Sequence, residues 1–406
     1  MAALDSYLTT YISDIGNVLQ KVIAPTIVTV LPSKCIWYDM LKKNSGVQKL
    51  ANNTFYITAR DGRHSGIAAV SEGAKLVSGK PKYSQMTISA KYVFGTFEVT
   101  DQLLEAAKDS KGAIVNYMTE QTSALRSDFA RELNRMFWGY GGEVVAKVAA
   151  GDATTGVTLT LAPAFTAVNS DIAATKYLAA GMKLDINGDA CQIVSVDSDT
   201  QVTLVAGITR VAGESVKKTD GDGTVVDEPM GADGIISNYA EGLVTTFQNV
   251  ARLTNTWASC GYFDATSEAL GLPKMELAYV TAKEFGDPSV IFMNKTLWKK
   301  YGNLLEGYKR TANLHEILSG GWKGLDFMGG DASVVLDYDT PDGKVVFVDP
   351  STITIGEMTP ISWIDRGDGV LRRVDYASWQ GVLRWYGNLI GKGNMRANAK
   401  LTAKTG

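Results

Sequence analysis

Cysteine and histidine are scarce in this chain of 406 residues, which has three cysteines and two histidines. Cys35, Cys191 and Cys260 lie far apart and in no CxxC spacing, which argues against a disulfide framework and against a thiolate metal site. We expect them to be buried as small apolar residues. His64 and His315 have no Cys or His at ligand spacing. We therefore expect neither a bound metal nor a cofactor.

An excess of one charge sign is also missing, because 40 Lys and Arg face 43 Asp and Glu, for a net charge of -3. Without a basic field the chain is not expected to hold nucleic acid by counterion release, so any contact with DNA should be weak and non-specific. No apolar run is long enough to cross a bilayer. The N-terminal stretch MAALDSYLTTYISDIGN has two Asp and no basic leader, so we expect neither a secretory signal nor membrane contact.

The motifs of common enzyme classes are absent, since no GxSxG, HExxH or GxGxxG occurs. The segment DINGD at Asp185 lacks the glycine and glutamate positions of a calcium loop, and a hairpin turn explains it. GNLIGKG at Gly387 lacks the spacing and the Ser or Thr of a phosphate-binding loop. We expect no catalytic site.

Three helices are predicted in the first third of the chain. Apolar residues recur at spacings of three and four from Leu4 to Val22, which indicates an amphipathic helix that ends before Pro25. A short helix is expected at roughly 101–108. A long one should run from about Ala113 to Trp138, on the order of 40 Å.

An extended hairpin is predicted between the first helix and the other two. TFYITA (54–59) and MTISAKYVF (86–94) alternate as strands do. The stretch between them is rich in glycine, poor in large apolar residues and more basic than acidic, so it cannot build a core. We interpret it as a projecting arm that needs a partner; the alternative is a disordered surface loop. The candidate contact residues at the arm are basic: Arg60, Arg63, Lys75, Lys80 and Lys82.

The long helix carries charged residues at i,i+3 spacing on the face away from its apolar stripe. Asp128 precedes Arg131, and Glu132 precedes Arg135. Such pairs are typical of a solvated face. A surface between subunits is the functional alternative, and these four residues are its candidates.

Residues 146–226 change character and become rich in Ala, Gly, Thr, Val and Asp. Val157, Leu159 and Leu161 alternate with Thr. MKLDI and ACQIVSV flank an Asn-Gly pair at 187–188, which predicts a type I′ hairpin, and the strand QVTLV follows. We expect a small all-β domain inserted into the chain.

The remaining sequence mixes helices and strands. A helix is expected from Gly234 to Leu253, then a buried strand SVIFM and a helix after Asn294. SVVLDYD and KVVFVD flank a turn at Thr340–Gly343. LRRVDYASWQGVLRWYGNLI is predicted as a strand pair around Gly381. The fold class is α+β, without the regular alternation of a doubly wound sheet.

The order of these elements resembles the tailed-bacteriophage major capsid proteins with the Hong Kong 97-like fold. Three stretches carry the resemblance: SAKYVFGTFEVTDQLLEAA, SVIFMNKTLWKKYGNLL and LDFMGGDASVVLDYDTPDGKVVFVDPSTITI. The inserted β domain departs from the minimal pattern of that family. The Lys, Asn and Glu of the family's self-catalysed crosslink cannot be matched here. The resemblance implies an N-terminal arm (1–45), an E-loop hairpin (46–98), a P-domain with a spine helix (99–145), the inserted β domain (146–226), an A-domain (227–369) and C-terminal P-domain strands (370–406).

The function that the resemblance implies is a structural one. Such a subunit self-assembles into hexamers and pentamers that form an icosahedral or prolate head enclosing double-stranded DNA, in a virion assembled in the host bacterial cytoplasm. Its main partner is itself, and portal, scaffolding and decoration proteins are further candidates. An encapsulin-like compartment shell shares the fold and is one alternative. A soluble enzyme or ligand-binding protein with an accessory β domain is another, from a different class.

Overall fold

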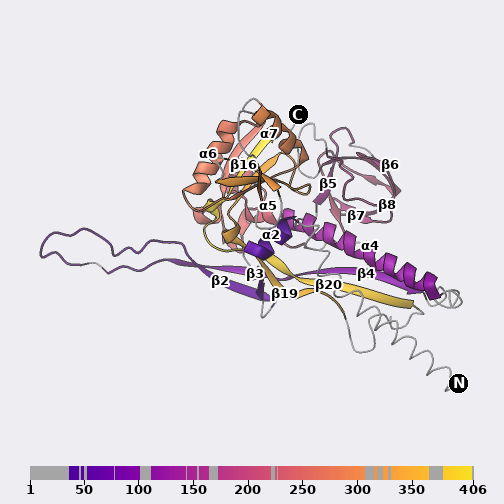
Figure 1. Ribbon diagram of the computed structural model, residues 1–406, viewed down its shortest axis with the longest axis horizontal. Coiled ribbons are helices and arrows are strands. Elements are labelled where there is room, and N and C mark those ends of the chain that lie inside the picture. Colours follow the sequence, from indigo (N-terminus) through magenta and orange to yellow (C-terminus); the bar gives the residue numbers. More distant parts are fainter. Residues whose placement is uncertain are drawn as a thin grey trace, which may run out of the picture.

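The computed structural model describes residues 36–44, 47–49, 53–76, 78–100, 111–142, 144–152, 155–163, 172–220, 225, 227–306, 315–317, 323–327, 331–364 and 378–404. The helices predicted at 4–22 and at 101–108 lie outside these residues, as does Cys35. These residues form four parts: an elongated sheet with a long helix along it, a projecting arm, a closed barrel and a larger sheet with helices (Figure 1).

The elongated sheet has four strands in the order β1–β19–β20–β4. They are β1 (Val47–Lys49), β19 (Ile353–Trp363), β20 (Ser378–Gly391) and β4 (Lys91–Thr100). Alternation along β4 buries Val93, Phe97 and Val99 on one face. Helix α4 (Lys111–Trp138) covers this face and buries Phe129 and Leu133 against it. The predicted spine helix is confirmed, with its end at Trp138.

An aromatic cluster joins the end of α4 to its neighbours. Trp138 lies 5.3 Å from Trp37 of helix α2 (Ile36–Asn44) and 5.0 Å from Phe292, measured between ring centroids. Trp37 and Phe292 are edge to face at 5.2 Å. Because all three rings are fully or nearly fully buried, they add apolar burial and favourable ring geometry at one point. This cluster anchors the elongated sheet to the larger one.

The larger sheet has seven strands in the order β13–β21–β18–β14–β17–β16–β15. Helices α6 (Leu272–Lys283) and α7 (Lys295–Glu306) share one hydrophobic cluster with it. The predicted helix after Asn294 is confirmed, since Asn294 Oδ1 accepts the N–H groups of Thr296 (3.1 Å) and Leu297 (3.2 Å) as an N-cap. The strands are β13 (Gly261–Ala269), β14 (Val290–Met293), β15 (His315–Ile317), β16 (Lys323–Phe327), β17 (Ala332–Leu336), β18 (Lys344–Val348) and β21 (Ala399–Lys404).

The two sheets do not follow the domain limits predicted from the sequence. β19 lies within 227–369 but pairs with β20 and β1 in the elongated sheet. β21 lies within 370–406 but pairs with β13 and β18 in the larger sheet. The chain therefore crosses between the sheets twice near its end. Periodicity within a strand carries no signal of which distant strand it will pair with.

Two predicted elements are wrong. In place of a helix over 234–253 the structure has α5 (Ala232–Ile235), a 3₁₀ turn (Tyr239–Glu241), and strands β11 (Thr246–Phe247) and β12 (Val250–Ala251). Buried Arg252 explains this irregular backbone, because its guanidinium donates to three carbonyl groups of the segment, those of Gly234, Ile235 and Ser237, and to that of Ala258 beyond it.

The strand pair around Gly381 is also wrong, because β20 runs straight through Gly381. This glycine serves close packing instead of a turn. A Cβ there would lie 2.7 Å from Cζ of Phe97 on the neighbouring strand. A ring therefore occupies the space above the glycine.

The inserted domain is a closed six-stranded barrel with its own core. Asn187 (φ 57°) and Gly188 (φ 94°) form the predicted type I′ turn between β7 and β8. Buried Arg210 pairs with Asp152 at 2.8 Å. The strands are β5 (Val144–Val148), β6 (Thr155–Pro163), β7 (Lys183–Ile186), β8 (Asp189–Ser198), β9 (Gln201–Thr209) and β10 (Ser215–Lys218).

A buried ionic cluster holds α5 and the 3₁₀ turn on the larger sheet. Lys400 Nζ lies 2.6 Å from Asp233 and 2.8 Å from Glu241, and Lys344 Nζ lies 2.8 and 2.9 Å from the same two carboxylates. Burial alone would raise the pKa of Asp233, but the two ammonium groups outweigh it and lower that pKa. Two positive and two negative charges compensate each other, as buried charges require.

Candidate assembly arm and polar junction

The arm is an antiparallel ribbon that leaves the body beside the elongated sheet and projects far beyond it (Figure 1). Its strands β2 (Thr54–Arg60) and β3 (Tyr83–Ser89) pair from Thr54 opposite Ser89 to Arg60 opposite Tyr83. Met86 and Ile88 are buried at the base. β3 ends before Ala90, and β4, which begins after it, belongs to the elongated sheet. The predicted strand 86–94 is therefore divided into two.

Two glycines allow the limbs of the arm tip (61–82) to approach each other. A Cβ on Gly66 would lie 2.6 Å from the amide nitrogen of Gly79, and a Cβ on Gly79 would overlap the backbone of Gly66. Gly66 N–H donates to His64 Nδ1 (3.1 Å), and Lys80 N–H donates to Ser65 Oγ (3.4 Å). His64 therefore accepts a local backbone hydrogen bond in the tip.

Asp61 closes the ribbon where the tip begins. Its N–H donates to Lys82 O (3.0 Å), and its carboxylate accepts from Ser84 Oγ (2.6 Å) and lies 3.1 Å from Lys82 Nζ. The Ser84 hydrogen bond, with Lys82 beside it, holds the pKa of Asp61 below its usual value although desolvation opposes this. Lys82 therefore has a partner within the arm, yet its side chain stays 71% exposed.

The arm exposes apolar side chains that no part of the described chain covers. Ile67 is 85% exposed and Leu76 is 76% exposed, and Val70, Tyr56 and Tyr83 are at least half exposed. Large exposed apolar residues along one projecting segment are typical of an interaction surface. All the basic residues predicted for the arm are exposed beside them: Arg60, Arg63, Lys75, Lys80 and Lys82.

The predicted charged face of α4 divides into two parts. Asp128 and Arg131 are exposed, so both remain candidates for a surface between subunits. Arg135 is buried, and Glu132 is half buried against it at 2.7 Å. The prediction for this second pair is corrected, because they meet partners within the chain. Local spacing could not reveal that the barrel would cover them.

Glu132 and Arg135 form a four-residue ion network with the barrel and the segment after it. Arg135 also pairs with Glu228, and Lys218 of β10 lies 3.0 Å from Glu132. Burial would lower the pKa of Arg135, but Glu132 and Glu228 outweigh it and raise that pKa. Burial opposes the charge of Glu132 as well, yet Arg135 and Lys218 lower its pKa to about 2. The network stays ionised and joins α4 to the barrel.

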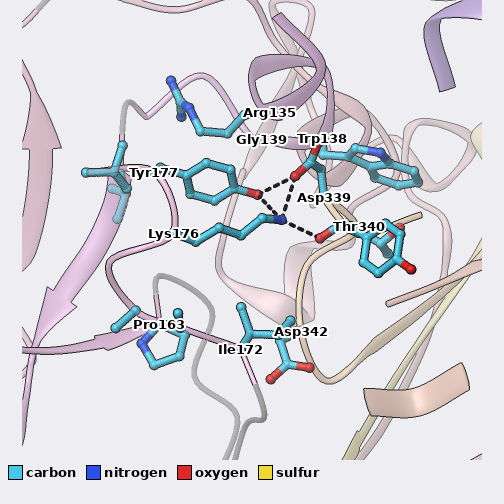
Figure 2. Close-up of a pocket in the computed structure, with 15 residues that line it drawn as sticks. Arg135, Trp138, Gly139, Pro163, Ile172, Lys176, Tyr177, Asp339, Thr340 and Asp342 are labelled. Atoms are coloured by element: carbon cyan, nitrogen blue, oxygen red, sulfur yellow. Dashed lines mark hydrogen bonds and ion pairs between the residues drawn. The ribbon is translucent and has the colours of Figure 1, made fainter. Parts of the chain in front are cut away.

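A second set of polar contacts joins the barrel to the larger sheet around a cavity of about 50 Å³ (Figure 2). Asp339, just beyond β17, accepts hydrogen bonds from Lys176 Nζ (2.6 Å), Tyr177 OH (2.9 Å) and Asn134 Nδ2 (2.6 Å). Lys176 also donates to Tyr338 O at 2.6 Å. One carboxylate therefore ties together the barrel, α4 and the larger sheet.

Asp337 lies under this contact and is fully enclosed. Its carboxylate accepts from Trp138 Nε1 (2.9 Å) and from the N–H of Asp339 (2.9 Å). Burial, followed by the charge of Asp339, raises the pKa of Asp337 to about 6. A perturbed carboxyl group can mark an active site. Here its two oxygens already serve an indole and a backbone amide, which is a structural arrangement.

No group of three or more His, Cys, Asp or Glu suited to hold a metal occurs in the part of the chain that the structure describes. Within the same residues no helix is long and apolar enough to cross a membrane. Cys191 and Cys260 are buried, as predicted, and burial raises the pKa of Cys260 to about 12. His315 lies in β15.

The junction residues Lys176, Tyr177, Asp337 and Asp339 were missed at the level of sequence. The run LDYD after a buried strand was visible, and acidic residues at the end of a strand often have a role there. Their partners come from a barrel about 160 residues earlier in the chain. No local pattern connects the two.

No family model matches the chain, and no curated protein matches it. Solved structures do match. The chain is similar to a protein of the cyanophage A-1(L) capsid asymmetric unit, with a TM-score of 0.54, 11% identity, and coverage of 91% of this chain and 93% of that one. Weaker matches include the capsid of a native GTA particle (TM-score 0.46, 13% identity, 90% of each chain) and Mycobacterium phage Adephagia (TM-score 0.41, 9% identity, 90% and 89%).

The similarity to the cyanophage capsid protein supports a shared fold, because it extends over almost the whole of both chains. At this identity it establishes the fold. The arm, the long helix along an elongated sheet, and the second sheet with its helices are the parts expected of that fold. The chain has the Hong Kong 97-like α+β fold of tailed-phage major capsid proteins.

Proposed function

We propose that this chain is the major capsid subunit of a tailed phage, and that copies of it form hexamers and pentamers that tile a closed head around double-stranded DNA. The observation that carries the proposal is the arm, which projects far beyond the body (Figure 1) and exposes Ile67 and Leu76. Such a surface is stabilised only when another molecule covers it. A second copy is the partner that the fold favours.

Heterologous contacts between copies explain how one arm can serve every subunit. An arm that reaches a different surface on a neighbour generates closed rings when the rotation between subunits closes. A lasting contact of this kind needs more than about 1,000 Å² of buried surface. An extended ribbon supplies such an area without enlarging the core. The role is structural and non-enzymatic.

The predicted division of the chain belongs to the same proposal: an N-terminal arm to residue 45, an E-loop to 98, a spine-helix segment to 145, an insertion to 226, an A-domain to 369 and P-domain strands to 406. Two strands are exceptions, because β19 belongs to the elongated sheet and β21 to the larger one. We further propose location in the virion after assembly in the bacterial cytoplasm. Portal, scaffolding and decoration proteins are the additional partners, with weak contact to packaged DNA. The near-neutral net charge of -3 supports weak contact.

Removing the apolar side chains of the arm tests the proposal. The triple variant Ile67→Ser, Val70→Ser, Leu76→Ser should fold normally but form no closed particles by negative-stain electron microscopy, alone or with a scaffolding protein. Its matched control changes three exposed valines of the barrel region, Val194, Val205 and Val211, to serine. The control should assemble like the wild type. Normal particles from the arm variant would refute the proposal.

The nature of the contents separates a phage head from a compartment shell of the same fold. Particles isolated from a lysate should hold double-stranded DNA that resists added nuclease. Particles filled with a protein cargo and free of DNA would favour an encapsulin-like shell. A subunit that stays monomeric at high concentration and binds a small molecule would favour the enzyme or binding-protein alternative.

A further inference from the structure

The base of the arm contacts a small hairpin whose turn has an uncommon backbone. β11 and β12 pair through Thr246 opposite Ala251 and Phe247 opposite Val250, which leaves Gln248 and Asn249 as a two-residue turn. Their φ angles are 46° and 69°. This is the type I′ combination, in which Asn and Gly are favoured. Gln is unfavourable in the left-handed region because of its Cβ.

Gln248 makes contacts in two directions from this turn. Its carboxamide, oriented so that both atoms are satisfied, donates from Nε2 to Gly391 O (3.0 Å) and accepts the N–H of Gly391 at Oε1 (2.7 Å). The carboxamide thus binds both backbone groups of Gly391, the last residue of β20, as a neighbouring strand would. The main-chain oxygen of Gln248 accepts the N–H of Thr87 in β3 at 3.0 Å.

The end of β20 is shaped to receive the hairpin. A Cβ on Gly391 would lie 2.8 Å from Cε2 of Phe247, so only glycine lets the hairpin approach. Phe247 is buried there, and the guanidinium of Arg252 lies 5.1 Å from its ring centroid. The hairpin is therefore fixed to the body on its inner side. The main-chain oxygen of Gln248 links it to the arm through Thr87.

Asn388 of β20 secures the same edge of the arm at a second point. Its side chain is buried, its Nδ2 donates to Ser89 O (2.8 Å), and its Oδ1 accepts the N–H of Met230 (2.8 Å). β3 pairs with β2 along one edge only. On its other edge, Gln248 therefore occupies the N–H of Thr87 and Asn388 occupies the carbonyl of Ser89.

We propose that Gln248 and Asn388 form a clasp that sets the direction in which the arm leaves the body, with Gln248 as a positioning residue. The backbone outlier supports this, because a strained conformation persists only where its surroundings enforce it and is concentrated at functional positions. A fixed direction also reduces the ordering that the arm must undergo on binding a neighbour. The clasp is a property of the subunit; its consequence for shells rests on the proposed function.

Two glycine substitutions in the same turn test the clasp. Glycine accepts positive φ without strain, so both Gln248→Gly and Asn249→Gly should retain the hairpin. Only Gln248→Gly removes the carboxamide that binds Gly391. We expect hydrogen exchange of the β3 peptide (83–89) in the unassembled subunit to become about tenfold faster in Gln248→Gly. It should stay at the wild-type rate in Asn249→Gly.

The two variants should also differ in assembly. Gln248→Gly should give particles of mixed diameter or open sheets by electron microscopy, while Asn249→Gly gives uniform particles. Wild-type exchange in Gln248→Gly would overturn the clasp. Faster exchange together with uniform particles would overturn its role in arm direction. If even the wild type forms no shells, the proposed function fails, but the exchange result still decides whether the clasp exists.

Discussion

Asp337 is a buried carboxylic acid whose ionised form is opposed by its surroundings. The pKa of its buried carboxyl group is raised from 3.8 to about 6, first by burial and then by the nearby charge of Asp339. The folded state therefore binds this proton more tightly than the unfolded chain does. The resulting loss of stability is absent below about pH 3.8, grows as pH rises, and is complete above about pH 6.

Replacement of Asp337 by Asn should remove this pH dependence. The stability of Asp337→Asn relative to the wild type, measured as the free energy of unfolding, should be about 1 kcal/mol greater at pH 7 than at pH 5, as the two pKa values imply. Urea denaturation of the unassembled subunit at both pH values measures the difference. An equal difference at the two pH values would show that the carboxyl group titrates normally.

Among the elements, β20 is the longest strand of the elongated sheet, with 14 residues, and it pairs with β19 on one side and with β4 on the other. Its side chains reach both faces, but Gly381 has none where the ring of Phe97 crosses it. Helix α7 provides a contrast. Gly302 in that helix has open space where a Cβ would lie.

Alanine at these two glycines should therefore have opposite effects. Gly302→Ala should stabilise the subunit by about 0.5–1 kcal/mol, because alanine favours a helix more than glycine does. Gly381→Ala should destabilise it by about 1–3 kcal/mol, because the new Cβ forces Phe97 to move. Thermal or chemical denaturation under identical conditions gives both values. Equal effects would mean that Phe97 adapts freely.

At the scale of the whole molecule, the barrel is a separate unit held on the body by polar contacts. Its core is distinct from the cores of the two sheets. Its first and last strands pair, with Lys147 opposite Ser215 and Ala146 opposite Val216, so the chain enters and leaves side by side. The described contacts to the body include Lys218 with Glu132 and Lys176 with Asp339.

Excision of the barrel should leave a folded body. A variant with residues 144–225 replaced by a short Gly-Ser linker should keep the circular dichroism of the remaining elements and melt cooperatively, at a temperature lower by several degrees. The decrease reflects Asp339 left without Lys176 and Tyr177. Circular dichroism and calorimetry measure both effects. A variant without a cooperative transition would show that the barrel is part of the body's folding unit.

Most elements with a strong local pattern were predictable. The spine helix, the Asn-Gly hairpin, the helix capped by Asn294 and the strands on either side of Thr340–Gly343 all occur at or near their predicted positions. Each depends on residues within about a dozen positions of each other. The arm was predictable from its lack of large apolar residues, since a glycine-rich stretch with few of them cannot form a core. Its basic residues remain predicted contact sites.

The failures share one cause. The apolar spacing between Gly234 and Leu253 suits a helix, but buried Arg252 and the turn at Gln248 and Asn249 bind the segment into an irregular loop. The face of α4 with Glu132 and Arg135 suits solvent, but Lys218 and Glu228 cover it. In each case tertiary contacts, from 6 to 18 residues away for Arg252 and from 86 to 93 residues away for Glu132 and Arg135, outweighed a local preference of a few tenths of a kcal/mol per residue.

By itself, the sequence determined the local elements, the α+β class and the coreless arm, because periodicity and turn residues act over a few positions. Only the tertiary structure decided which strands share a sheet, which charges are buried and how the arm is clasped at its base. These depend on contacts between separate segments, 58 residues apart for Arg210 and Asp152 and 299 residues apart for Asn388 and Ser89. Their free energy comes from burial and hydrogen bonds that form only when the whole chain is folded.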